Sequence, residues 1–153
     1  MRLTSPAFGN EKAIPRRYSG EGEDISPPLS WKDAPRGTKS FALICEDPDA
    51  PKGTFHHWAA YDIAPERMEL PEAFPLTSTQ NGVKQAVNDF GSQGYRGPMP
   101  PKGHGPHHYH FRLIAIDTEH LPVGLGATVK EVEAAARAHS LVEAWLTGIY
   151  ERH

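Results

Sequence analysis

The sequence predicts a mainly β fold that forms one domain over residues 1–153. Its 15 prolines and 14 glycines have no collagen-like period and indicate many turns and long ordered loops. Three stretches have strand patterns, whereas only one has a helix pattern. A chain of this length buries roughly two-thirds of its unfolded surface, which is enough for a core without disulfides. No internal repeat or composition break marks a second domain.

Alternation of side chains defines the inward face of each expected strand. Residues 25–31 should be extended, because each proline restricts the residue before it. The three strand patterns lie at residues 40–46, 56–63 and 107–117. The expected inward faces are, in order, Phe41, Leu43, Cys45 and Asp47; His57, Ala59, Tyr61 and Ile63; and His107, Tyr109, Phe111, Leu113 and Ala115.

The helix pattern lies near the end of the sequence. Thr128 with Glu131 three residues later fits a capping box. Apolar residues from Val132 to Leu146 recur at helical spacing, and Gly148 is the expected stop. The pattern leaves open whether the helix continues unbroken past His139–Ser140.

Composition excludes several classes of function. The net charge is −3 and no basic stripe is present, which argues against nucleic-acid binding. The N-terminus lacks the pattern of a signal peptide and no apolar run approaches membrane-spanning length, so we expect a cytoplasmic protein without stable membrane insertion. The single cysteine, Cys45, lies in the middle of a strand and is expected to be an inert small hydrophobe.

Histidines gather in two short segments beside Pro/Gly loops. Six of the nine lie at 56–57 and 104–110. The segment Asp-Pro-Asp-Ala-Pro (47–51) ends the preceding strand, and the long loop 88–106 holds many glycines and prolines. Long loops inside compact domains are often functional. The sequence therefore predicts a cleft with a carboxylate, two imidazoles and a rigid loop.

Such a cleft can serve three kinds of chemistry. Imidazole N–H groups can bind an oxyanion, imidazole and carboxylate can ligate zinc, and two histidines can form an acid–base pair. The spacing His104-x-x-His107 crosses a Gly-Pro turn and matches no familiar zinc spacing. No activated nucleophile motif is present, so we expect a binding protein without a cofactor, with a histidine-based hydrolase as the alternative.

Two strings resemble the signatures of a known family. D-P-D-A-P-K-G-T-F-H-H-W (47–58) resembles the first signature of the phosphatidylethanolamine-binding protein family, and G-P-M-P-P-K-G-H-G-P-H-H-Y-H-F (97–111) resembles the second in its bacterial and archaeal form. Residues 88–91 and 141–152 are similar to the prokaryotic, Raf kinase inhibitor-like branch as well. The resemblance runs from about residue 5 to the end.

This resemblance implies a Greek-key antiparallel β-sandwich with one or two peripheral helices. It also implies a pocket for phosphate, phosphoryl head groups or carboxylate anions, and a homodimer. Eukaryotic relatives bind protein kinases and other signalling proteins, so the resemblance also offers a regulatory role as a further hypothesis, but no partner-binding segment is visible here. The ligand-binding residues implied are Asp47, Asp49, His57, Gly97, Pro100, Pro101, Gly105, His107 and Tyr109.

The remaining histidines are expected to lie outside the pocket. His56, His108 and His110 should point away from the core face as rim or surface residues, while His104 either reaches the mouth or is solvated. Position 108 departs from the usual G-x-H-R-Y pattern, because histidine replaces arginine. The loss of a permanent cation predicts that anion affinity depends more strongly on pH in this chain.

Overall fold

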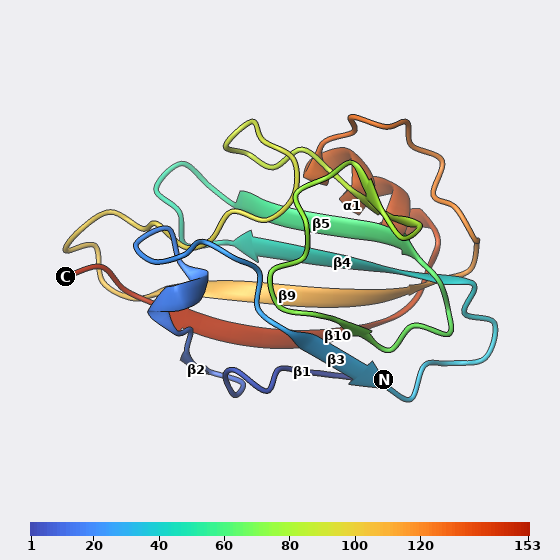
Figure 1. The fold of residues 1–153 in the computed structure, drawn as a ribbon, viewed down its shortest axis with the longest axis horizontal. Coiled ribbons are helices and arrows are strands. Elements are labelled where there is room, and N and C mark those ends of the chain that lie inside the picture. Colours follow the sequence, from blue (N-terminus) through green and yellow to red (C-terminus); the bar gives the residue numbers. More distant parts are fainter.

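A computed structural model describes residues 1–153 and places ten strands in two sheets, with one α-helix and one 3₁₀ helix (Figure 1). The strands are β1 (Arg2–Thr4), β2 (Lys12–Ala13), β3 (Leu29–Lys32), β4 (Ser40–Asp47), β5 (Phe55–Ile63), β6 (Glu69–Leu70), β7 (Thr79–Gln80), β8 (Val83–Gln85), β9 (His107–Ile116) and β10 (Ser140–Tyr150). The helices are η1 (Arg16–Tyr18) and α1 (Val129–Ala138).

The larger sheet has seven strands in the order β2-β10-β9-β4-β5-β8-β7, and the smaller has three in the order β1-β3-β6. All paired strands are antiparallel except β2, which pairs with β10 in parallel. Figure 1 shows β4, β5, β9 and β10 side by side as the body of the sheet. The predicted mainly β, Greek-key class is confirmed.

The main core lies between the two sheets. Trp31 of the small sheet packs edge-on against Phe41 of β4, with ring centroids 5.6 Å apart. The inward faces predicted for β4 and β9 are confirmed, because their apolar members belong to this core. Burial of this apolar surface is the main term that stabilises the sandwich.

Helix α1 covers part of the other face of the large sheet. Val129, Val132 and Ala136 pack there against β4, β5 and β9. The predicted capping box is present: the Thr128 side chain accepts from the Glu131 backbone N–H at 3.2 Å, and Glu131 accepts from the Thr128 N–H at 3.2 Å. No helix is long and apolar enough to cross a membrane.

The segment beyond His139, for which the pattern left the helix open, forms a strand, so the expected helix stop at Gly148 is wrong. Helix α1 ends at Ala138, and β10 begins two residues later and pairs with β9 along its length. Ala144, Leu146 and Tyr150 are buried in the main core at a period of two. Gly148 allows close packing instead of stopping a helix, because a Cβ there would lie 2.4 Å from Ile14 Cγ1.

A β-bulge interrupts the pairing of β4 with β5. Cys45 pairs with Trp58 and Glu46 pairs with His56, so His57 has no partner on β4. A bulge of this kind adds one residue to one strand and shifts its alternation of faces from that point on.

Because of the bulge, the inward face predicted for β5 is wrong in part. Alternation put His57 on the same side as Ala59 and Tyr61, but those two pack on the α1 side of the sheet. His57 instead shares the main-core side with its neighbour Trp58. The pocket histidine therefore reaches the expected face through an irregularity that alternation does not predict.

Candidate functional site

One end of the large sheet holds a cavity of about 200 Å³, where β4 ends and β5 and β9 begin. Of the nine residues predicted for the site, six line it: Asp47, His57, Pro100, Pro101, His107 and Tyr109. The other lining residues are Ala50, Pro51, Phe55, Phe90 and Met99.

A buried ion-pair partner holds the first imidazole. His107 Nδ1 lies 2.7 Å from Asp47 Oδ2, and these side chains are only 2% and 4% exposed. Because a carboxylate can only accept, Nδ1 carries the proton and Nε2 is the ring nitrogen left for other partners. The second oxygen, Asp47 Oδ1, accepts from the Asp49 backbone N–H at 2.8 Å, which fixes the carboxylate.

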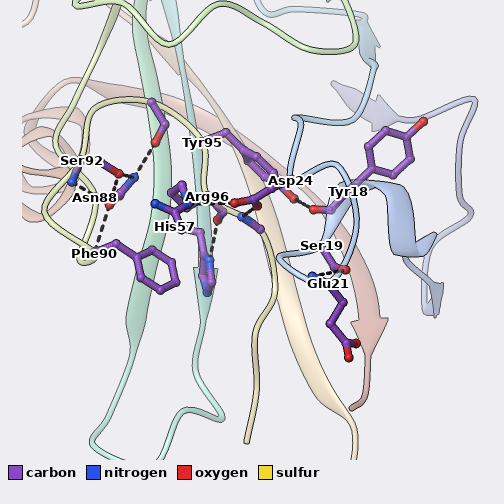
Figure 2. Close-up of polar contacts among 12 residues, drawn as sticks. Tyr18, Ser19, Glu21, Asp24, His57, Asn88, Phe90, Ser92, Tyr95 and Arg96 are labelled. Atoms are coloured by element: carbon purple, nitrogen blue, oxygen red, sulfur yellow. Dashed lines mark hydrogen bonds and ion pairs between the residues drawn. The ribbon is translucent and has the colours of Figure 1, made fainter. Parts of the chain in front are cut away.

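The second imidazole is held by the backbone of the pocket loop. His57 Nδ1 donates to the Arg96 carbonyl oxygen at 2.7 Å, a contact drawn in Figure 2. Burial lowers the pKa of His57 and outweighs the Arg96 carbonyl, which acts to raise it. The ring is therefore neutral at pH 7, and its Nε2, which makes no hydrogen bond within the chain, is an acceptor.

Aromatic rings form most of the apolar wall. Phe55, Phe90 and Tyr109 all contact the His57 ring, with centroids 5.0, 5.6 and 5.3 Å away. Burial and the charge of Asp47 raise the pKa of Tyr109, so its hydroxyl keeps its proton. Sequence reasoning did not assign Phe55, Phe90 or Met99 to the site. The only signal was their position beside or within the two signatures and the intervening loop.

A network of polar contacts shapes the loop that carries Phe90 (Figure 2). The buried Asn88 side chain accepts from the Phe90 N–H at 2.9 Å and donates to the Gly94 carbonyl at 2.8 Å. Farther along, the Asp24 carboxylate accepts from Arg96 Nε at 2.8 Å and from the Gly97 N–H at 2.6 Å. These contacts hold the Arg96 carbonyl in place for His57.

Three predicted site residues do not reach the cavity lining. Gly97 lies behind it, where a Cβ would be 2.1 Å from the Tyr18 carbonyl oxygen. Gly105 has a left-handed backbone with φ +88° in the loop before β9. Asp49 lies outside and accepts from the His108 backbone and ring, at 2.8 and 2.7 Å. Burial acts to raise the pKa of Asp49, but these His108 contacts outweigh it and lower the pKa.

The other histidines take varied positions. His56 is buried, not at the surface as expected, because its backbone and ring both donate to Asp89 Oδ2. His110 packs on the half-exposed Trp145 ring. His104 lies on the loop tip and contacts His107. No group of three or more histidine, cysteine or carboxylate side chains is arranged to hold a metal ion.

Comparison with known proteins gives the family. The model of the family described as phosphatidylethanolamine-binding protein matches residues 4–151. The chain belongs to the phosphatidylethanolamine-binding protein family.

Relatives support this membership along the whole chain. A UPF0098 protein of Aquifex aeolicus is 47% identical over 152 residues, covering 99% of this chain and 89% of the relative. YbhB of Escherichia coli is 38% identical over 158 residues, covering 98% and 99%. The crystal structure of E. coli YbcL, described as a new member of the mammalian PEBP family, superposes with a TM-score of 0.93 at 34% identity, covering 99% and 98%.

Within this phosphatidylethanolamine-binding protein family, the departure at position 108 has a structural correlate. His108 is paired with Asp49 outside the cavity, and both side chains are about two-fifths exposed, at 43% and 40%. An exposed pair of this kind contributes little to stability. Neither residue lines the cavity, and the expected stronger pH dependence of anion affinity stays a prediction.

Proposed function

We propose that the pocket binds a small oxyanion, namely a phosphate, a phosphoryl head group or a carboxylate. The observation that supports this proposal most directly is the Asp47–His107 pair in the cavity lining, which orients the His107 ring through Nδ1 and leaves Nε2 as the ring nitrogen that can contact a ligand. When Nε2 carries a proton, it can donate a hydrogen bond to an anion.

The charges at the pocket favour a singly charged ligand. The Asp47 carboxylate already brings a negative charge into this buried site, so each further charge on the ligand adds repulsion and desolvation cost. His57 offers an acceptor, Nε2, which suits a ligand oxygen that carries a proton. We therefore favour the monoanion of a phosphate ester, with the Phe55 and Phe90 rings beside its carbon atoms.

The lining favours binding over turnover. It contains no serine, threonine or cysteine that could act as a nucleophile, and burial raises the pKa of the nearby Cys45 thiol. The hydrolase alternative would use His107 to activate water. A phosphatase and esterase screen tests it: a rate lost in His107→Ala would establish catalysis and overturn the binding-only proposal.

Calorimetry and thermal shift with inorganic phosphate and phosphoethanolamine near pH 6 test the binding itself. We expect millimolar or tighter binding, with stabilisation of about 1.4 kcal/mol when the anion is at ten times Kd. His107→Ala should abolish the signal, whereas His139→Ala, far from the cavity, should retain it. No signal with either anion in the wild type would reject the proposal.

We also propose that two copies pair along the free edge of β10. Its neighbour β2 pairs only with Gly148 and Ile149, and Asn10 and Glu11 bond the backbone of Thr147. Residues 140–146 therefore have no strand on that side. Leu141, Val142 and Trp145 are exposed along this stretch. An exposed apolar edge strand is a ready template for another strand.

A further inference from the structure

The loop tip before β9 places a third imidazole against the pocket pair. His104 Nδ1 lies 2.6 Å from His107 Nε2, and the two ring centroids are 4.8 Å apart. The Asp47 carboxylate already accepts the hydrogen bond from His107 Nδ1–H. Nε2 is therefore the one ring nitrogen of His107 available to a ligand, and His104 occupies it in this structure.

A bound anion and His104 need the same atom. Nε2 has a single in-plane position for a hydrogen bond, whichever of the two nitrogens carries the shared proton. An oxyanion that accepts from Nε2 must therefore replace the 2.6 Å contact with His104.

We propose that His104 competes with the anion for His107 Nε2 and thereby sets the affinity of the pocket. This inference rests on the proposed anion-binding function and assigns a regulating side chain to that same site. In the absence of an anion, His104 satisfies the pocket imidazole, and anion binding displaces the His104 ring into solvent.

The local backbone allows this displacement. His104 is exposed and lies between Gly103 and Gly105, which have φ of +72° and +88°. A Cβ at either glycine would meet nothing within 4 Å, so the surrounding space is open. Apart from His107, the only hydrogen-bond partner of His104 is the Pro101 carbonyl, which its backbone N–H contacts at 3.2 Å.

The cavity wall is anchored independently of His104. Arg152 Nη1 donates to the Pro100 carbonyl at 3.3 Å, and the Arg152 carbonyl accepts from the Gly103 N–H at 3.1 Å. The C-terminal segment therefore holds both flanks of the loop. Movement of the His104 ring leaves the lining residues Pro100 and Pro101 in place.

His104→Ala tests the competition, with inorganic phosphate as the titrant in calorimetry. We expect phosphate affinity to rise about fivefold, the factor that corresponds to loss of one competing intramolecular hydrogen bond. His108→Ala is the matched control, because it also removes an imidazole close to His107 in sequence, but one that pairs with Asp49 outside the cavity. Unchanged or weaker affinity in a folded His104→Ala protein would overturn the inference.

A readout without ligand separates this inference from the proposed function. In nitrogen-detected NMR, His104→Ala should change the chemical shift of His107 Nε2. The chemical shift of His107 Nδ1 should stay the same, because the hydrogen bond to Asp47 is kept. A His107 Nε2 signal that is identical in both proteins would show that the contact is absent and would overturn the competition. If wild type and variant both fail to bind phosphate, the proposed function fails, whatever the NMR result.

Discussion

The Nδ1 atom of His57 donates a 2.7 Å hydrogen bond to the carbonyl oxygen of Arg96, across 39 residues of sequence. This bond joins the bulged strand β5 to the loop that closes the pocket. It fixes the tautomer with the proton on Nδ1, while burial of the ring makes protonation of His57 unfavourable in the folded state.

A pH dependence of stability follows from this neutral ring. Burial lowers the pKa of His57 in the folded protein below the ordinary 6.5, so the unfolded chain binds the proton more readily. The contribution of His57 to stability is therefore present above the unfolded pKa and is lost as pH falls below it. Urea unfolding at about pH 7.5 and about pH 5.5 should show a loss of at most about 1.4 kcal/mol from this residue.

The variant His57→Asn should lose the part of the pH dependence of unfolding free energy that comes from His57. The control is His153→Asn, which removes a histidine at the chain end and should keep that dependence. Equal slopes for His57→Asn and the wild type would show that the ring titrates alike in both states.

The two aspartates of the first signature should differ in their energetic effects. Asp47→Ala leaves His107 Nδ1 without its partner in a buried site, and we expect a loss of about 2–4 kcal/mol in unfolding free energy. Asp49→Ala removes only a half-exposed pair with His108 and should cost less than about 1 kcal/mol. Denaturant unfolding of both variants measures the difference, and equal losses would contradict the burial argument.

Alanine substitutions at the two glycines implied for the second signature should also destabilise the protein to different extents. At Gly97 a Cβ would lie 2.1 Å from a backbone oxygen, so Gly97→Ala must shift the loop against Tyr18. At Gly105 space is open and only the left-handed φ resists, at about 1–2 kcal/mol. Thermal unfolding should therefore rank Gly97→Ala as the more destabilised variant, by about 1 kcal/mol or more. The reverse order would indicate that the Gly97 loop relaxes easily.

Pairing through the β10 edge predicts a variant that is folded and monomeric. Trp145→Lys places a charge on the exposed side chain of that edge and should halve the molar mass measured by light scattering. Leu125→Lys, a more exposed apolar position outside the strands, should leave the mass unchanged. A wild-type protein that is already monomeric would refute this pairing.

Local pattern predicted most of the frame, because alternation in β4 and β9 and the capping box at Thr128 reflect backbone geometry directly. It failed where two periods fit equally well. Val142 and Leu146 are spaced as in a helix, yet Ala144 and Leu146 are spaced as in a strand, and pairing with β9 decided the outcome. The pocket walls from Phe55 and Phe90 depend on contacts 35 residues apart, which no local pattern contains.

The bulge in β5 has a consequence for both adjacent histidines, and not only for the ring in the pocket. Bulges are points where a strand can gain or lose a residue without changing the register of its distal half. Deletion of either histidine of the pair would leave one histidine directly before Trp58, since His56 and His57 are adjacent. The doubled imidazole therefore keeps a histidine directly before Trp58 after the loss of one residue, while Trp58 keeps its pairing with Cys45 on β4.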